Sequence, residues 1–278
     1  MKIEKIKKDI IVIGGGLAGI CAAISGARNG KQVGLIQNRS VLGGNSSSEV
    51  RVWVSSATKH GGNRYARETG IMGELFLENQ YRNIDGNPYI WDSLLLEKVM
   101  AEPNVELFLD TEVSEVAATD GHIDSVTGWM QGSERRLTFA GAYYIDCTGD
   151  GLIGFLSGAE YMLGREAQET FGESLAPEVA DQELMGSTLL FYTKAEDKNI
   201  EFVAPAFAKD IAKTSILKNR VIRSGDSGGR YWWIEWGGEI DIVENNGKIR
   251  QELLSIIYGI WDYIKNSGNF DADNLTLE

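Results

Sequence analysis

The chain has 278 residues, with 27 Lys and Arg against 40 Asp and Glu, and a formal net charge of −13. This length allows one large domain or two modest ones, and a hydrophobic fraction of 43% excludes a disordered chain. The acidic balance argues against a nucleic-acid partner, because neutralising phosphates requires clustered Lys and Arg. With two Cys and two His, we expect no disulfide framework and no metal site.

The N-terminus has the pattern of neither a signal peptide nor a membrane helix. It is basic over residues 1–9, but only residues 10–13 form an apolar run before three glycines. A signal peptide needs a longer apolar core, and a membrane helix needs about 20 apolar residues. We therefore expect a soluble protein with no membrane partner, and the low Cys count favours the reducing cytoplasm.

Residues 9–37 have the pattern of a βαβ unit. Residues 10–13 predict a strand buried on both faces, and a glycine-rich turn follows at once. The Ala-rich stretch 20–29 predicts a helix that Gly30 closes, and residues 31–36 predict a second strand. Strand, turn, helix and strand fit within about 30 residues, as such a unit requires.

The glycines of this turn each have a mechanical reason. Gly14 allows the tight turn, Gly16 lets the backbone approach a pyrophosphate, and Gly19 lets the helix pack closely on the strand. The helix N-terminus at Leu17 and Ala18 offers free N–H groups and a positive dipole end to phosphates. The pattern predicts dinucleotide binding, and the alternative is a glycine-rich loop of an unrelated α/β protein.

The end of the second predicted strand supplies further cofactor candidates. Dinucleotide sites usually place Asp or Glu there to bind a ribose hydroxyl, and this chain has Gln37. Its amide can accept a hydrogen bond from a ribose hydroxyl without a charge, and the alternative is an ordinary polar residue at a strand end. Asn38 lies beside it, and Arg39 could stack on adenine, reach a phosphate or be a solvated loop residue.

The rest of the chain predicts an α/β fold that changes character near residue 160. Helices are expected over 69–81 and over 93–101, the second capped by Asp92 and ended before Pro103. A third parallel strand (105–109), a β-meander (112–138) and a further strand (142–147) follow. Beyond them we expect a loop at 171–180, strands at 189–192 and 231–236, and an amphipathic helix at 249–265.

Two glycine motifs and their order give the chain a family resemblance. Gly14-x-Gly16-x-x-Gly19, followed after the second strand by Leu42-Gly43-Gly44-Asn45-Ser46, resembles FAD-dependent oxidoreductases of the glutathione-reductase-type two-dinucleotide-fold superfamily. The meander and the closing Asp146-Cys147-Thr148-Gly149-Asp150-Gly151 are similar to that group's order of elements. The resemblance extends through the whole chain and is most specific over residues 9–50 and 104–165.

The resemblance implies FAD as the cofactor and assigns roles by position. In the family, the Leu-Gly-Gly loop lies along the pyrophosphate and toward the flavin, the backbone at the position of Val113 meets the adenine, and the Thr-Gly-Asp turn lies close to the cofactor. Gln37 departs from the family's carboxylate. The positions that carry these implied contacts are Gly43, Gly44, Asn45, Ser46, Val113, Thr148, Gly149 and Asp150.

The resemblance also implies a domain division. Residues 1–165 would form a Rossmann-like FAD-binding domain with a parallel sheet, a β-meander and a polar insertion at about 45–103. Residues 166–278 would form part of a mixed α+β substrate or cap domain. Family members are longer and return to the flavin after the substrate domain, so we expect this chain to be an N-terminal portion of a longer member.

Catalytic candidates lie in the polar insertion, because a flavin performs the redox chemistry and the protein supplies orientation and electrostatics. His60 could act as a base near neutral pH, and Arg51 could stabilise a reduced, anionic flavin. Each could instead be a surface or salt-bridged residue. Further charged candidates of the same insertion are Glu49, Arg64 and Arg67.

The densest aromatic cluster is Tyr231-Trp232-Trp233-Ile234-Glu235-Trp236. Alternation in a strand would place positions 231, 233 and 235 on one face and 232, 234 and 236 on the other. One face could be a stacking platform for a sugar or another flat substrate, and the alternative is core packing on both faces. Together with the resemblance, the cluster suggests a carbohydrate-related substrate.

Three functions remain open from the sequence. The first is an FAD-dependent oxidoreductase that transfers a hydride between a small-molecule substrate and FAD. The second is an incomplete FAD-binding fragment or module without turnover. The third is an NAD(P)-dependent oxidoreductase on the same βαβ unit, which the Leu-Gly-Gly loop disfavours.

Overall fold

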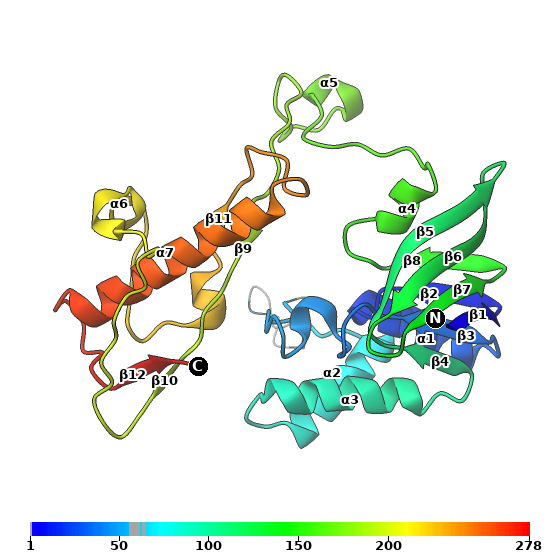
Figure 1. Cartoon of the computed structure of the whole chain (residues 1–278), viewed down its shortest axis with the longest axis horizontal. Coiled ribbons are helices and arrows are strands. Elements are labelled where there is room, and N and C mark those ends of the chain that lie inside the picture. The colour runs from blue at the N-terminus through cyan, green and yellow to red at the C-terminus, as the bar shows by residue number, and fades with distance from the viewer. Residues whose placement is uncertain (1, 56–61, 63–64) are drawn as a thin grey trace. The chain divides into compact units, whose positions relative to one another are not determined.

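A computed structural model describes residues 2–55, 62 and 65–278 of the chain (Figure 1). The chain folds into two compact units, Met1–Tyr161 and Met162–Glu278. The assignment of the first to FAD and of the second to substrate stays a prediction. Among the described residues, no helix has the length and apolar character needed to cross a membrane.

The first unit is built on a four-stranded parallel sheet with the order β4-β3-β2-β8. Each of the central strands β2 and β3 is short and almost entirely buried, which fits the β-branched runs that predicted them. The predicted third parallel strand is confirmed as β4, paired in register with β3. The strands are β2 (Ile10–Ile13), β3 (Val33–Ile36), β4 (Val105–Phe108) and β8 (Tyr143–Asp146).

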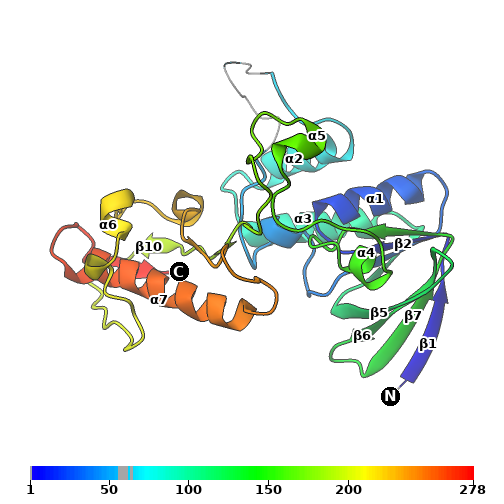
Figure 2. The same cartoon turned by 90° about the horizontal axis from the view of Figure 1, so that it is seen from above.

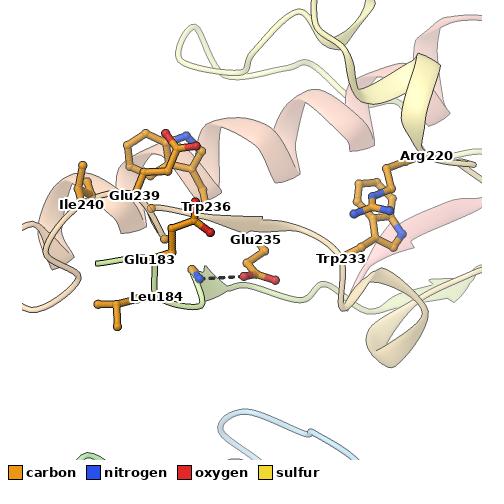
Figure 3. A pocket seen from close by; sticks show the side chains of 11 residues that line it. Glu183, Leu184, Arg220, Trp233, Glu235, Trp236, Glu239 and Ile240 are labelled. Carbon is orange, nitrogen blue, oxygen red and sulfur yellow. Dashed lines mark hydrogen bonds between the residues drawn. The ribbon is translucent and has the colours of Figure 1, made fainter. Parts of the chain in front are cut away.

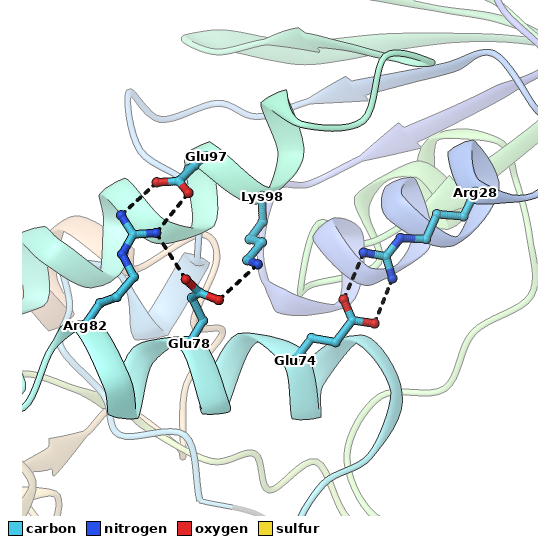
Figure 4. Close-up of polar contacts among 6 residues, drawn as sticks. All are labelled: Arg28, Glu74, Glu78, Arg82, Glu97 and Lys98. Carbon is cyan, nitrogen blue, oxygen red and sulfur yellow. Dashed lines mark hydrogen bonds and ion pairs between the residues drawn. The ribbon is translucent and has the colours of Figure 1, made fainter.

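Helices α1 (Leu17–Arg28) and α3 (Pro88–Met100) lie on one face of this sheet, and α2 (Gly70–Arg82) packs on these two helices. They share a single buried core with β2 and β3. Ion pairs also join them: Arg28 Nη1 on α1 lies 2.8 Å from Glu74 on α2, and Arg82 Nη2 on α2 lies 2.9 Å from Glu97 on α3 (Figure 4).

The start of α3 corrects one prediction. Asn87 caps this helix, because its side-chain oxygen accepts hydrogen bonds from the N–H groups of Tyr89 and Ile90, and Pro88 occupies the first turn. Asp92 therefore lies inside the helix rather than at its start. Its buried carboxylate accepts a hydrogen bond from Ser48 N at 2.9 Å and so ties the loop after β3 to α3.

A second sheet, with the order β1-β7-β6-β5, packs on the other face of the parallel sheet. The predicted meander is confirmed as β5 (Thr111–Thr119), β6 (His122–Met130) and β7 (Arg135–Ala140), all antiparallel neighbours. β1 (Lys2–Lys7), which pairs parallel with β7, was not predicted. It is a charged edge strand, and Arg135 Nε donates to its Glu4 at 3.0 Å.

The core between the two sheets contains Ile11, Ile13 and Phe108 from the parallel sheet, with Phe139 from the meander. The rings of Phe108 and Phe139 meet edge to face, with centroids 4.9 Å apart. The first unit thus has three layers, helices, parallel sheet and mixed sheet, and the short helix α4 (Leu152–Leu156) follows β8 (Figure 2). This is the predicted α/β fold.

The second unit is organised around one long helix, α7 (Asn246–Asn266), which confirms the amphipathic helix predicted there. Its apolar face, which includes Leu253, Ile260 and Trp261, packs with aromatic residues from the surrounding coil. The other elements are short: α5 (Gln168–Phe171), α6 (Ile216–Asn219), and the antiparallel pairs β9 (Ser187–Thr188) with β11 (Glu235–Trp236) and β10 (Thr193–Ala195) with β12 (Leu275–Leu277).

One strand prediction in the second unit is wrong, and another is confirmed only at its end. Residues 189–192 form the connection between β9 and β10. In the aromatic cluster only β11 is extended, and Tyr231 ends a 3₁₀ turn, Gly228–Tyr231. Tyr231 and Ile234 are both buried while Trp232 is 63% exposed, so the buried positions recur every three residues and the predicted two-residue alternation does not exist.

Candidate cofactor site

The turn after β2 requires glycine at two positions. Gly14 has a φ of +105°, and a Cβ there would lie 2.1 Å from Cys147 O, at the end of the neighbouring strand. A Cβ on Gly19 would lie 1.8 Å from Gly14 O. Gly14 therefore makes the turn from β2 into α1 close to the residue that follows β8. Gly19 lets α1 pack directly against that turn.

Gly16 differs from both, because space is open beside it. The nearest atom to a Cβ on Gly16 would be the Cα of Gly44, at 4.0 Å. Gly16 is the N-cap of α1, and in the described structure no side chain caps this helix and its first turn has no acidic residue. The N–H groups at Leu17 and Ala18 thus keep the anion-binding character of a helix start, next to a space that only a small residue leaves free.

The second glycine loop lies directly against the first. Gly43 N donates to Gly15 O at 2.8 Å, and Gly43 pairs with Gly16 as an isolated parallel bridge. A Cβ on Gly44 would lie 3.2 Å from the Cα of Gly16, and both Gly43 and Gly44 have positive φ. The structure therefore brings together the two motifs that carried the family resemblance, with backbone facing backbone.

Side chains then fix the end of this loop. Ser46 Oγ donates to Gly43 O at 2.8 Å and accepts from Trp91 Nε1 at 3.1 Å. Asn45 is exposed in the middle of a 3₁₀ turn, Gly44–Ser46, and its carbonyl accepts from Val52 N at 2.8 Å. The contact from Trp91 on α3 was not predicted, since nothing in the local sequence indicates which distant helix will reach the loop.

Gln37 connects the two loops through its side chain. It is 5% exposed, its Oε1 accepts from Gly15 N at 2.8 Å, and its Nε2 donates to Val41 O at 3.0 Å. An amide suits this position because one end must accept and the other must donate. Its predicted contact with a ribose hydroxyl stays a prediction, and the contacts within the protein give it a positioning role in addition.

The two residues that follow Gln37 are exposed to solvent. These are Asn38 and Arg39, and Arg39 Nη1 lies 3.6 Å from Glu49 Oε2.

Val113, predicted to meet adenine through its backbone, is buried in β5 opposite Gly128. The structure places it in the core between the two sheets of the first unit.

A capped turn follows β8 beside the glycine loops. Asp146 Oδ1 accepts from Thr148 N and Oγ1, at 3.0 and 2.7 Å, and its Oδ2 accepts from Ile153 N and Gly154 N. Desolvation alone would raise the pKa of Asp146, but the hydrogen bonds from Thr148, Gly154 and Ile153 outweigh it and lower that pKa. Asp146 thus shapes the turn that carries Thr148.

The other two positions predicted in this turn are Gly149 and Asp150. Gly149 has a φ of +93°, which favours glycine there, and Asp150 is exposed. Thr148 Oγ1 accepts from Leu152 N at 3.0 Å, so it satisfies the first N–H group of α4, whose N-cap residue is Gly151. The positioning role of Asp146 was missed in the sequence, although an Asp two residues before a Thr-Gly turn is a recognisable signal for such a cap.

The catalytic candidates have unequal support. His60 lies outside the described residues, as does Arg64. Arg51 has a φ of +60°, its Nε donates to Ser48 O at 3.2 Å, and its guanidinium Cζ lies 5.7 Å from the ring centroid of Tyr89 on α3. The backbone at Arg51 is therefore held in a conformation that L-residues rarely adopt, on the loop that continues from the second glycine motif.

The two cysteines are free thiols. Burial raises the pKa of Cys21, and burial and then the charge of Asp146 raise the pKa of Cys147. A raised pKa leaves little thiolate at neutral pH, so neither thiol has the character of a reactive cysteine.

Comparison with known proteins gives one family match. The model of the family described as "FAD dependent oxidoreductase" matches residues 9–278. A search of curated proteins found no significant match.

Solved structures resemble parts of the chain at low identity. They include a geranylgeranyl bacteriochlorophyll reductase-like protein from Thermoplasma acidophilum (14% identity, TM-score 0.41, 59% of this chain and 45% of that chain). Two others are L-proline dehydrogenase from P. horikoshii (18%, 0.33, 53% and 24%) and adenylylsulfate reductase from Archaeoglobus fulgidus (15%, 0.36, 53% and 31%). The chain spans less than half the length of each of these proteins.

Proposed function

Because the chain belongs to the FAD-dependent oxidoreductase family, we propose that its first unit holds FAD against the two glycine loops and that the protein transfers a hydride between a small-molecule substrate and the flavin. The family membership favours FAD over the alternative NAD(P) cofactor. The glutathione-reductase-type subclass stays a prediction.

One observation carries the proposal. The backbone of Gly43 and Gly44 lies against Gly15 and Gly16, at the uncapped start of α1. A pyrophosphate needs N–H donors and close approach of the backbone, and this arrangement supplies both without a competing side chain. The residues present therefore fit the dinucleotide part of FAD.

The chain's own residues would then bind and orient the cofactor. N–H groups at Leu17 and Ala18 would donate to phosphate oxygens, and Gln37 would hold the two glycine loops in register. Thr148, Gly149 and Asp150 would approach from the turn after β8. FAD, when bound, supplies the hydride-accepting chemistry, and the protein supplies orientation and electrostatics.

Arg51 is the catalytic candidate that the structure describes. Its guanidinium would supply positive charge beside the bound cofactor, and its contacts with Ser48 and Tyr89 hold it in place. His60 is retained as a proposed base. A matched test compares Arg51→Lys, which keeps the charge, with Arg51→Met: loss of activity only in the second would support an electrostatic role.

We propose a carbohydrate-related small molecule as the substrate, and the tryptophan-rich segment of the second unit supports this proposal.

We propose the cytoplasm as the location of the protein, and the two free, weakly acidic thiols support this proposal. The competing function is an FAD-binding module without turnover.

The experiment that separates these functions has two stages. The purified chain is first mixed with FAD, and flavin absorbance that stays with the protein after desalting supports the cofactor. The flavoprotein is then mixed anaerobically with neutral sugars and sugar alcohols. Bleaching of the flavin bands supports the proposed oxidoreductase, whereas bound FAD that none of these compounds reduces contradicts the proposed substrate class.

A further inference from the structure

The second unit contains a pocket that the cofactor site does not use. It has a volume of about 540 Å³ and is lined by parts of the segments 183–186 and 233–240 together with Arg220 (Figure 3). Ligand pockets in proteins typically have volumes of 300–1,000 Å³, so this one is large enough for a small organic molecule. All of its lining residues belong to the second unit.

Glycines bring the two segments that line the pocket together. β9 and β11 pair through Ser187 and Trp236. A Cβ on Gly186 would lie 2.8 Å from Trp236 O, and a Cβ on Gly238 would lie 2.4 Å from Leu184 O. These close approaches fix the backbone that carries the pocket's side chains.

Two tryptophans give the pocket flat apolar walls. Trp233 and Trp236 are half-buried and pack against the core around α7. Each already has a cation near its ring: Arg220 Cζ lies 5.8 Å from the centroid of Trp233, and Lys248 Nζ lies 5.8 Å from that of Trp236. A cationic ligand on Trp233 would meet Arg220, which lines the pocket, and the ring of Trp236 already has Lys248 beside it, so the rings favour a neutral partner.

Carboxylates supply the polar part of the lining. Glu235 Oε1 accepts from Gly186 N at 2.8 Å, which orients its carboxylate in the middle of the pocket (Figure 3). Glu183 is paired with Arg165 at 2.9 Å, and Glu239 lies at the end of the pocket near Trp236. Ionised carboxylates only accept hydrogen bonds, so they suit a ligand with many hydroxyl donors and repel phosphates and carboxylates.

We propose that this pocket binds a neutral saccharide. The apolar C–H face of a sugar ring would lie on a tryptophan ring, its hydroxyls would donate to Glu235 and Glu239, and Arg220 would donate to its oxygens. The choice of ligand deepens the proposed substrate class and in that respect rests on the proposed function. Binding itself requires no flavin, so the two proposals can fail separately.

The test is a titration of the full chain with cellobiose, maltose and lactose, followed by tryptophan fluorescence and by saturation-transfer NMR. We expect at least one of these disaccharides to bind. Trp236→Ala should weaken that binding by about tenfold or more, and Glu239→Gln, which changes only an exposed carboxylate, should weaken it by about threefold to tenfold. Trp232→Ala is the matched control, because Trp232 is 63% exposed and does not line the pocket.

The outcomes separate the two proposals. Unchanged sugar binding in Gly16→Val, a variant designed to exclude FAD, would support a pocket that acts independently of the cofactor site. The proposal is overturned if none of the three disaccharides binds, if Glu239→Gln and Trp236→Ala bind as tightly as the unsubstituted chain while both stay folded, or if choline or glucuronate binds in preference to them.

Discussion

The two candidate sites of this chain differ in whether main-chain atoms or side chains form them. The cofactor site in the first unit is made of backbone: Gly14, Gly16, Gly43 and Gly44 bring main-chain atoms together and leave space beside an uncapped helix start. The pocket in the second unit is lined by the side chains of carboxylates, an arginine and two tryptophans, beside the short strand pair β9 and β11. The first suits a cofactor that many proteins share, and the second suits a particular ligand.

Adding one carbon at a closely packed glycine of the first site should have the largest effect on stability. Gly19→Ala should lower the free energy of unfolding by about 3 kcal/mol, because the new Cβ would lie 1.8 Å from Gly14 O. Urea unfolding followed by circular dichroism measures this. Gly247→Ala is the matched control, since it also lies in a helix and nothing lies within 4 Å of its Cβ position, and it should unfold at the same or a slightly higher urea concentration than the parent chain.

A smaller loss is expected where a side chain connects the backbone loops. Gln37→Leu leaves the N–H of Gly15 without its partner at a buried site, and should cost about 2 kcal/mol of unfolding free energy and weaken FAD binding. The exposed Gln32→Leu should cost less than about 0.5 kcal/mol. Equal losses in the two variants would show that Gln37 does not position the loops.

The turn after β8 should show a pH-dependent effect. Hydrogen bonds lower the folded-state pKa of Asp146, so the stability it contributes is present above its ordinary pKa and is lost as the pH falls through the folded pKa. Asp146→Asn should cost about 1 kcal/mol at neutral pH and less in acid below about pH 4. The unfolding free energies of Asp146→Asn and the unsubstituted chain, measured at neutral pH and below about pH 4, check this. A difference between the two chains that is larger in acid than at neutral pH would contradict it.

The smallest effect is expected at exposed ion pairs, which belong to neither site. Arg28 contacts Glu74 and Glu102, but its side chain is 41% exposed. Arg28→Met should change the unfolding free energy by about 0.5 kcal/mol, and the difference should shrink in high salt. A loss above that of Gln37→Leu would mean that side-chain charges, rather than backbone packing, hold the first unit together.

The sequence predicts the first unit far better than the second, and the reason is physical. A strand, a glycine-rich turn and an Ala-rich helix are determined by local sterics, so β2, α1 and β3 form where the pattern placed them. β1 was not predicted because its charged residues suit only an edge strand. Its partner, β7, also lies more than a hundred residues away in the sequence. Which loops meet was predictable only through the family resemblance.

In the second unit most of the structure is coil packed around α7, and local hydrophobic patterns do not predict the conformation of such coil. Alternation failed for the segment from Tyr231 to Trp236 because a 3₁₀ turn begins it, so that Trp233 and Trp236 come to line the same pocket. Only α7, whose apolar face recurs at the helical period over five turns, could be recognised from the sequence alone.

The most direct test of the central claim is a calorimetric titration with FAD of the unsubstituted chain, Gly16→Val and Gly225→Val. We expect the unsubstituted chain and Gly225→Val to bind FAD equally, because nothing lies within 4 Å of the Cβ position of Gly225. Gly16→Val should keep its unfolding temperature but lose FAD binding, because its side chain fills the space beside the start of α1. Normal FAD affinity in a folded Gly16→Val variant, or no binding by the unsubstituted chain, would show that FAD is not held against the two glycine loops.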